Sequence, residues 1–293
     1  MKIYTKEAGK TGVKPTANVG FEQSFPIQQR IINDDLAPKL FSGMNGFWIK
    51  ISKYASIRTF LVNLTEKLMP GGWSMFLVRK RYIDSKLIET IENYDIHNVV
   101  NLGAGMDTRL YRFPILQNKK CYEMDQTESV NSKRKAIVKA LGVFPQYVQQ
   151  VPINFIKESI DEKMKSNGYN PEEKTFFIWE AVSQYLDMPN LEKTFDFFSN
   201  SPKGSFLAFT YVLKDFVEGK NLFNQKVLYK LTVRNNLWIS CFNPNEIKGF
   251  LEKYNWELIE DVSYRELDNW YVKPTGRKLG VCDVERVVFA RKK

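Results

Sequence analysis

The sequence predicts a doubly wound α/β fold, in which helices cover both faces of a mostly parallel sheet, and three observations support this. From residue 97 onward, segments typical of strands alternate with segments typical of helices, the order that builds a parallel sheet. The runs VVNL from Val99 and FFIW from Phe176 are nearly continuously apolar, as central strands buried on both faces are. The last strand segment, ERVVFA from Glu285, follows its predecessor without a helix between them, so these two strands must pair antiparallel.

The order of the segments predicts a seven-stranded sheet with helices between its strands. The strand segments cover residues 97–102, 120–124, 147–153, 175–179, 205–211, 256–262 and 285–290. Helices are expected near residues 75–94, 127–141, 156–166, 189–199 and 245–253. Residues from about 212 to 243 interrupt the alternation with a polar, aromatic and helical pattern, which predicts an insertion after the fifth strand.

The region before the first strand is expected to be mostly helical. Residues 1–20 contain many Lys, Thr and Gly residues and few large apolar ones, which is typical of a flexible lead-in. Residues 21–94 are expected to form a helical cap, which either packs as an ordinary layer or covers a pocket. With 293 residues and 43% hydrophobic content, the chain is long enough for residues 21–293 to form a single elaborated domain with its core at residues 95–293.

The composition limits which kinds of protein and partner are expected. With 43 basic and 33 acidic residues, the formal net charge is +10, which suits an anionic substrate, a nucleic acid or an acidic membrane surface and does not choose among them. Cys121, Cys241 and Cys282 lie far apart, so we expect a reduced, cytoplasmic protein with no metal site. The N-terminus lacks a signal peptide's apolar core, and no apolar run reaches the roughly 18 residues that span a bilayer. We therefore expect no membrane partner. The protein is expected to be a monomer or a homodimer.

The most informative stretch is VVNLGAGMDTRLYRF, which starts at Val99. A buried strand ends at Leu102 and is followed by Gly103, Ala104 and Gly105, whose small side chains let the backbone turn tightly and approach a ligand closely. Tight turns of this kind also use glycine for structural reasons alone. The turn nevertheless predicts a ligand site at this edge of the sheet.

An acidic residue, Asp125, lies twenty residues beyond Gly105, at the end of the second predicted strand. A carboxylate there can accept hydrogen bonds from both hydroxyls of a ribose, which nicotinamide dinucleotides and S-adenosylmethionine share. The dinucleotide fingerprint needs a third small residue where this chain has Thr108. The carboxylate of Asp107 would repel a pyrophosphate and attract the sulfonium and ammonium groups of S-adenosylmethionine. The pattern therefore favours S-adenosylmethionine.

These residues resemble the leucine carboxyl methyltransferase family of S-adenosylmethionine-dependent methyltransferases. NLGAGMDTRLYRF is similar to the family's cofactor loop, and further similar blocks follow in the right order from about residue 78 to 186. The family includes many bacterial small-molecule O-methyltransferases and the RNA-modifying enzymes of wybutosine synthesis. The resemblance implies a Rossmann-like fold, with S-adenosyl-L-methionine as the cofactor.

The resemblance also implies roles for individual residues. VRKRYIDSKL is similar to the block whose arginine binds the methionine carboxylate of the cofactor, which is Arg79 here, with Arg81 as the alternative. CYEMDQ matches the block whose aspartate, here Asp125, holds the ribose. In IWEAVSQYL the glutamate beside the cofactor is Glu180, and Tyr185 belongs to the same block. The cofactor loop contributes Gly103, Ala104, Gly105 and Asp107.

One block departs from the family. The family places an Asp after the third strand, where it meets the adenine amino group, and this chain has VPINF with Asn154. An amide oxygen can accept the same hydrogen bond, so the resemblance assigns Asn154 to the adenine. The first 70 residues match no block, and in the family this region helps to form the acceptor pocket. The resemblance therefore does not imply which molecule is methylated.

No dedicated general base is expected. The only histidine, His97, lies at the start of the first strand, whereas ligands of such sheets bind beyond the carboxyl ends of the strands. A carboxylate acceptor is already ionised at neutral pH and needs no base. We therefore expect O-methylation of a carboxylate or an acidic hydroxyl, on a small molecule or a peptide C-terminus. Tyr185 and Tyr211 are candidates for the substrate pocket.

Two other functions remain open at this point. The net charge of +10 and the RNA-modifying branch of the family suit an RNA-modifying methyltransferase, although the basic residues are dispersed and a nucleic-acid partner is not expected. A nicotinamide-dependent oxidoreductase is the other alternative, and Asp107 and Thr108 argue against it.

Overall fold

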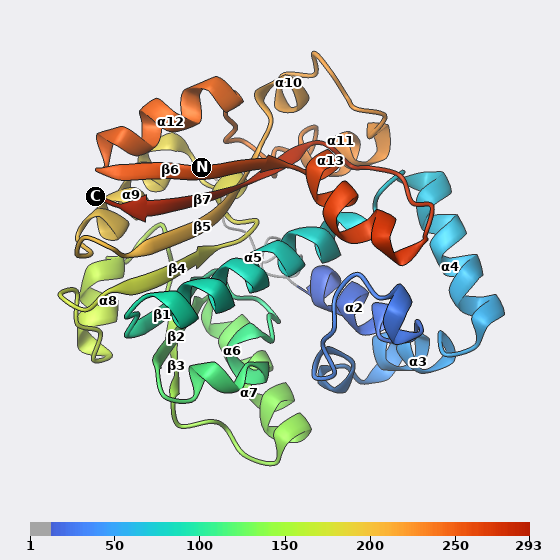
Figure 1. Cartoon of the computed structure of the whole chain (residues 1–293), viewed down its shortest axis with the longest axis horizontal. Coiled ribbons are helices and arrows are strands. Elements are labelled where there is room, and N and C mark those ends of the chain that lie inside the picture. The colour runs from blue at the N-terminus through green and yellow to red at the C-terminus, as the bar shows by residue number, and fades with distance from the viewer. Residues whose placement is uncertain (1–12) are drawn as a thin grey trace.

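The protein is organised around one mixed sheet, shown in Figure 1 by a computed structural model that describes residues 13–293. Its strands are β1 (Asn98–Leu102), β2 (Lys120–Asp125), β3 (Val148–Pro152), β4 (Thr175–Trp179), β5 (Phe206–Val212), β6 (Trp256–Ser263) and β7 (Glu285–Lys292). They form a seven-stranded sheet in the order β3-β2-β1-β4-β5-β7-β6. Strands β1 to β5 run parallel to one another, and β7 lies antiparallel between β5 and β6. The expected α/β fold with an antiparallel last strand is confirmed.

Helices cover both faces of the sheet. They are α5 (Ser74–Asn93), α6 (Arg109–Arg112), α7 (Thr127–Leu141), α8 (Ile160–Ser166), α9 (Met188–Ser199), α12 (Pro244–Lys253) and α13 (Tyr264–Leu267). Phe176 and Ile178 of β4 belong to the apolar cluster that contains the buried residues of α5, and Phe177 and Trp179 belong to the cluster that contains those of α9 and α12. Successive β4 residues point to opposite faces, so both faces are buried, as the apolar run predicted.

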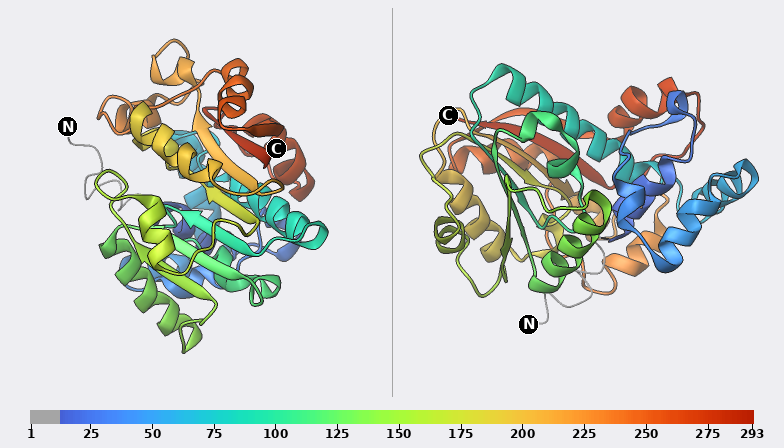
Figure 2. Two further views of the ribbon diagram at one scale, coloured as in Figure 1. Left: turned by 90° about the vertical axis from the view of Figure 1, so that its left-hand side faces the viewer. Right: turned by 90° about the horizontal axis from the view of Figure 1, so that it is seen from below.

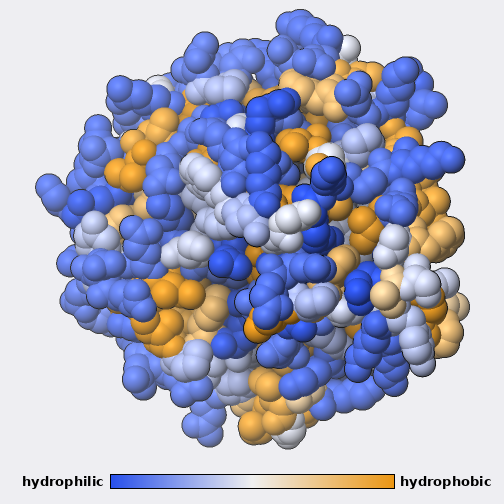
Figure 3. Space-filling view, turned by 45° about the vertical axis from the view of Figure 1, so that its right-hand side comes forward, coloured by the Kyte–Doolittle hydropathy of each residue, from blue (hydrophilic) through white to orange (hydrophobic). Residues whose placement is uncertain are grey.

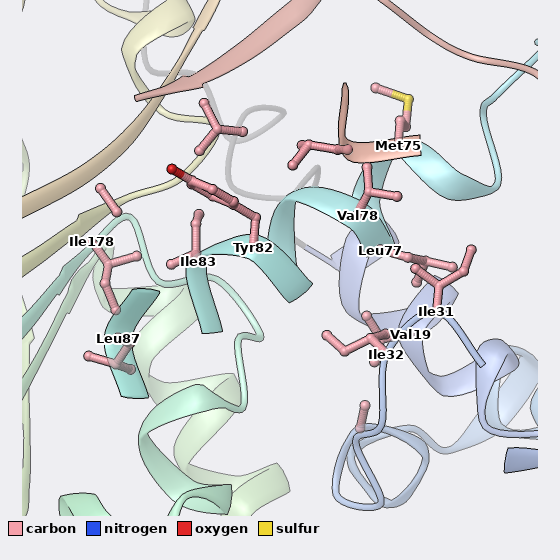
Figure 4. Close-up of a cluster of buried hydrophobic side chains, with 14 of the residues drawn as sticks. Val19, Ile31, Ile32, Met75, Leu77, Val78, Tyr82, Ile83, Leu87 and Ile178 are labelled. Carbon is pink, nitrogen blue, oxygen red and sulfur yellow. The ribbon is translucent and has the colours of Figure 1, made fainter. Parts of the chain in front are cut away.

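The cap consists of α2 (Val13–Glu22), α3 (Gly43–Ile51) and α4 (Ala55–Leu68), which lie to one side of the sheet (Figures 1 and 2). Helix α5 joins this cap to the sheet. Figure 4 shows Val19 and Ile31 of the cap beside Leu77, near the start of α5, and Leu87, farther along the same helix, near Ile178 of β4. Helix α5 therefore packs against both the cap and the sheet.

The lead-in expected at residues 1–20 is helical from Val13 onward, and residues 1–12 lie outside the described part of the chain. Thr16 and Val19 of α2 are buried. Glu22, also buried, accepts hydrogen bonds from Trp73 Nε1 at 2.8 Å and from Arg277 Nη1 at 2.6 Å. Composition alone did not reveal this helix because most of its buried side chains are small and it depends on partners far away in the sequence.

The expected insertion after β5 contains α10 (Lys214–Val217) and α11 (Lys226–Thr232). Short 3-10 turns occupy Ile27–Gln29, Ala37–Leu40, Pro114–Leu116, Ser183–Tyr185 and Lys273–Thr275, and a π turn occupies Asp268–Val272. Helix α8 begins later than predicted because Asn154 Oδ1 accepts backbone N–H groups of the next turn and Ser159 caps the helix. None of the helices in residues 13–293 has the length and apolar character needed to cross a membrane.

Candidate functional site

A cavity of about 360 Å³ lies at the carboxyl ends of β1, β2 and β4. Ligands of open α/β sheets bind at this edge. Its lining falls into two chemical groups. The polar group includes Lys14, Thr16, Arg79, Lys80, Asn101, Asp107, Asp125, Glu180, Gln184 and Glu285, together with the backbone of Gly103, Ala104 and Gly105. The apolar group includes Met69, which follows α4, Met75 and Phe76 at the start of α5, and Leu228, Leu231, Leu237 and Trp238 from the insertion.

The glycine turn forms part of the cavity wall. Gly103 has φ +67°, and a Cβ at this position would lie 2.4 Å from Cγ2 of Val182, so glycine is required there. Gly105 also has a positive φ, +46°. The N–H groups of Gly103 and Ala104 donate to the carbonyl of Met124 at 2.8 and 3.1 Å, which holds the turn against the end of β2.

Asp125 lies in the wall beside this turn. Its Oδ2 accepts the N–H of Gly105 at 2.7 Å, and its Oδ1 accepts the N–H of Gln126 at 2.7 Å. Burial raises the pKa of the Asp125 carboxyl, and these two backbone hydrogen bonds oppose that effect. The side chain of Ser129 also hydrogen-bonds to this carboxyl, and Asp125 lines the cavity. A carboxylate has about four acceptor positions, so Asp125 can accept a further hydrogen bond from a ligand.

Two cationic side chains of α5 form ion pairs with three carboxylates in the cavity. Arg79 donates through Nε to Glu180 at 2.9 Å and through Nη1 to Glu285 at 2.8 Å. The Nζ of Lys80 lies 2.6 Å from Asp107 and 3.4 Å from Glu180. All five side chains are less than a tenth exposed. Because buried charges need partners, this mutual pairing keeps the site charged without a ligand.

The cations determine the ionisation of Glu180. Burial alone would raise the pKa of this carboxyl, but the charges of Lys80, Arg109 and Arg79 outweigh it and lower the pKa to about 2. Arg109 reaches Glu180 through Nη2 at 3.1 Å. Glu180 is therefore a carboxylate at neutral pH and a poor proton acceptor.

This shift predicts how stability depends on pH. The folded-state pKa of Glu180 lies below its ordinary value of 4.5, so its stabilising contribution is complete above that value and is lost as the pH falls towards 2. Over this window the free energy of unfolding is expected to fall more steeply for the wild type than for Glu180→Gln. Urea unfolding followed by circular dichroism at a series of pH values measures both slopes, with the exposed Glu192→Gln as the control. Parallel curves for the wild type and Glu180→Gln would contradict the assignment.

Helix geometry explains which basic residues of VRKRYIDSKL reach the cavity. Phe76, Arg79 and Lys80 lie on one side of α5, at positions i, i+3 and i+4, and all three line the cavity. Arg81, the alternative to Arg79, does not line it. Its guanidinium donates to the carbonyl of Ile31 at 3.0 Å, in the cap. Lys80 was missed at the sequence level, although the same periodicity would have indicated it.

The remaining sequence candidates lie in different places. Tyr185 lines the cavity. Tyr211 is not among the lining residues, and its hydroxyl donates to Asp261 at 2.9 Å. Asn154 is exposed and lies outside the cavity, where its amide oxygen accepts backbone N–H groups of its own turn. His97 precedes β1, at the opposite edge of the sheet from the cavity.

Two cavity residues gave no signal in the sequence. Glu285, at the start of β7, accepts the hydroxyl of Tyr264 at 2.6 Å and the amide of Gln184 at 3.1 Å, in addition to its ion pair with Arg79. Ala181, which follows Glu180, has φ +57°, a conformation that non-glycine residues rarely adopt. Its N–H donates to Thr210 Oγ1 at 2.8 Å, which holds this strained backbone in the cavity wall.

Within residues 13–293, no group of three or more His, Cys, Asp or Glu side chains is arranged to hold a metal ion. Of the acids in the cavity, Asp107, Glu180 and Glu285 are paired with Arg79, Lys80 or Arg109. The site therefore presents carboxylates, ammonium and guanidinium groups to a ligand.

Comparison with known proteins identifies the family. The model of the leucine carboxyl methyltransferase family matches residues 13–199, which hold the glycine turn, Asp125 and Glu180. YktD of Bacillus subtilis, classed as an S-adenosyl-L-methionine-dependent methyltransferase, is 26% identical over 198 residues, covering 66% of this chain and 65% of that protein. A protein of the same class from Mycobacterium marinum is 25% identical over 214 residues, covering 72% of this chain and 66% of its own length. The chain thus matches about two thirds of the length of these relatives.

Solved structures support the fold. A DUF574-family protein from Streptomyces avermitilis superposes with a TM-score of 0.57 at 14% identity, covering 79% of this chain and 88% of its own. A candidate methyltransferase from Thermobifida fusca superposes with a TM-score of 0.56 at 16% identity, covering 81% of this chain and 88% of its own. At these identities the likeness concerns the fold alone. The family model and the fold together show that the chain belongs to the leucine carboxyl methyltransferase family, whose characteristic cofactor is S-adenosyl-L-methionine, as the sequence motifs predicted.

Proposed function

We propose that the protein is an enzyme that transfers the methyl group of S-adenosyl-L-methionine to a carboxylate or an acidic hydroxyl, on a small molecule or a peptide C-terminus. One observation carries this proposal. A single cavity combines the glycine turn and Asp125, which suit an adenosyl cofactor, with an apolar wall from the insertion that suits an acceptor. The reacting groups would then meet inside one enclosed site.

The polar residues of the cavity match the cofactor group by group. Asp125 would accept the two ribose hydroxyls, and the backbone at Gly103 and Gly105 leaves room for the adenosyl group. Asp107 would attract the ammonium and sulfonium groups. Arg79 and Lys80 would bind the methionine carboxylate, because an ammonium has three donors and Lys80 uses two of them within the protein. The cavity thus already contains the acidic group that suits the cofactor's cations and the basic groups that suit its carboxylate.

Methyl transfer in this site depends mainly on positioning. When bound, the cofactor supplies a methyl carbon that its sulfonium has already activated. The walls of the cavity must hold an acceptor oxygen on the side of that carbon opposite the sulfur. The oxygen's electron pair forms the new C–O bond as the C–S bonding pair returns to sulfur, which leaves neutral S-adenosylhomocysteine. No proton transfer is required when the oxygen is already ionised.

The residues that line the cavity favour an acceptor that reacts without a general base. No histidine lines the cavity in the described residues 13–293, and Glu180, with its pKa of about 2, is a poor base. Lys14, at the start of α2, is exposed, lines the cavity and forms no ion pair with another described residue. Its free charge would attract an anionic acceptor. These features favour a carboxylate over an alcohol.

Transfer of labelled methyl groups tests this proposal. Purified protein is incubated with radiolabelled S-adenosyl-L-methionine and a library of small carboxylic acids, phenols and alcohols, and the products are then treated with mild base. We expect label in carboxylic acids, released by base as methanol, because methyl esters are base-labile. Base-stable label confined to alcohols would contradict the proposed acceptor, although not the use of the cofactor.

A matched pair of variants on α5 tests the binding of the methionine carboxylate. Lys80→Met is expected to weaken binding of S-adenosyl-L-methionine by roughly tenfold to a hundredfold, which corresponds to one charge-assisted hydrogen bond of about 1.5–3 kcal/mol. Arg81→Met removes a similar side chain outside the cavity and should leave the affinity unchanged. Isothermal titration calorimetry measures both. A loss confined to Arg81→Met would transfer the role to Arg81.

A further inference from the structure

Helices α3 and α4 carry a group of large apolar side chains that are exposed. Seven large apolar side chains on this stretch are exposed, with Met44 at 71%, Phe60 at 63% and Leu68 at 58%. Single exposed apolar residues are ordinary, but a contiguous group marks an interaction site. We call this set the α3–α4 face: Met44, Phe47, Trp48, Tyr54, Phe60, Leu64 and Leu68.

The arrangement on α4 is that of an amphipathic helix turned outward. Phe60, Leu64 and Leu68 are spaced four residues apart and so lie along one side of the helix. Val62 is the one residue of α4 that is buried. Figures 1 and 2 show α4 at the periphery of the cap, away from the sheet, and Figure 3 shows hydrophobic side chains gathered on the side that carries it.

The charges around this face are basic. Lys50, Lys53 and Lys67 are exposed and form no ion pair with another described residue. Glu66 is the single acid between residues 43 and 68, and its carboxylate accepts the N–H groups of Gly71 at 3.0 Å and Gly280 at 2.7 Å, within the protein. An occupant of the α3–α4 face therefore meets apolar and aromatic side chains bordered by unpaired lysines. In a symmetric dimer formed through this face, the lysines of one copy would lie near those of the other, and the repulsion between these like charges is unfavourable.

The α3–α4 face is continuous with the mouth of the cavity. Met69, the residue after α4, lines the cavity. Leu231 of α11 also lines it and is 54% exposed, so its side chain belongs to both the cavity and the surface. The amide of Gln225, just before α11, donates to the carbonyl of Pro70 at 2.7 Å, which joins the insertion to the turn after α4. An occupant of this face would therefore lie beside the cavity entrance.

We propose that the α3–α4 face binds the surface of an anionic phospholipid bilayer. The aromatic and aliphatic side chains enter the boundary between headgroups and acyl chains, and the lysines contact the lipid phosphates. This orientation places the cavity mouth against the lipid surface. The proposal revises the expectation of no membrane partner, and it takes up the acidic membrane surface that the net charge of +10 also suits. It rests on the surface alone and does not depend on the proposed chemistry.

Vesicle sedimentation tests this contact with the full chain. The protein is mixed with vesicles of phosphatidylcholine alone or of phosphatidylcholine with phosphatidylglycerol, and the bound fraction is measured after centrifugation. We expect binding to the anionic vesicles that weakens as salt is added, and little binding to neutral vesicles. The triple variant Lys50→Gln, Lys53→Gln, Lys67→Gln is expected to bind about a hundredfold more weakly, because each lysine near the surface contributes about fivefold.

Two variant pairs provide the controls. Phe60→Ser with Leu64→Ser should also lose vesicle binding, whereas Val143→Ser with Ile259→Ser, exposed apolar residues elsewhere, should not. Equal binding of all variants, or no binding of the wild type to anionic vesicles, would overturn the proposal. A dimer in sedimentation velocity that Phe60→Ser with Leu64→Ser dissociates, without vesicle binding, would assign the face to a second copy of the chain. Binding of S-adenosyl-L-methionine without vesicles is measured separately, so its failure bears on the proposed function only.

Discussion

Replacing Asp125 by alanine is expected to weaken the binding of S-adenosyl-L-methionine by about a hundredfold or more. The substitution removes the carboxylate at the end of β2, which would accept both ribose hydroxyls, and each hydrogen bond to a charged group contributes about 1.5–3 kcal/mol. It also leaves the N–H of Gly105 without its acceptor at 2.7 Å. Isothermal titration calorimetry with S-adenosyl-L-methionine measures the loss.

Two further variants separate cofactor binding from general damage. Asp125→Asn keeps one acceptor oxygen and should show a smaller loss than Asp125→Ala. Gln149→Ala, on the neighbouring strand β3, changes an exposed residue outside the cavity and should leave the affinity unchanged. If Asp125→Ala binds as tightly as the wild type while remaining folded by circular dichroism, the ribose does not lie at the end of β2.

Replacing Glu285 by alanine is expected to lower the free energy of unfolding by roughly 3–5 kcal/mol, the usual effect of removing one partner of a buried ion pair. Glu285 is fully buried, and its carboxylate holds Arg79 at 2.8 Å, the hydroxyl of Tyr264 at 2.6 Å and the amide of Gln184 at 3.1 Å. Its removal leaves a buried guanidinium and two donors without this acceptor. Urea unfolding followed by circular dichroism measures the change.

Glu285→Ala is also expected to affect the cavity and not only the stability of the fold. Arg79 lines the cavity and depends on Glu285 for its position, so Glu285→Ala should also weaken cofactor binding. Glu257→Ala removes an exposed acid from β6 and is expected to change stability by less than about 0.5 kcal/mol. A stability change below about 1 kcal/mol for Glu285→Ala would show that the buried network does not hold β7 to α5.

Local patterns were sufficient to predict the strands of the sheet and the direction of the last one. The apolar run at Phe176 predicted a strand buried on both faces, and β4 has apolar clusters on each side. The missing helix before Glu285 predicted an antiparallel strand, and β7 pairs antiparallel with both neighbours. That β7 lies between β5 and β6 could not be predicted, because strand order depends on packing between distant segments.

The candidate site was predictable where its signal was local. Gly103, Gly105 and Asp125 stand at strand ends, where small residues and acids indicate a ligand-binding edge, and all three line the cavity. Glu285 carried no such signal, because its partner Arg79 lies 206 residues away along the chain. The apolar wall from Leu228 was also inaccessible, since nothing in the insertion indicates where it folds back over the sheet.

Calorimetric titration of S-adenosylhomocysteine into the wild-type protein and into Gly105→Val tests the central claim most directly. Gly105 has a positive φ and lines the cavity, so a branched side chain there would strain the turn and occupy the space that the adenosyl group needs. We predict saturable one-to-one binding by the wild type and none by the folded variant. No binding by the wild type, or equal binding by both proteins, would contradict the account.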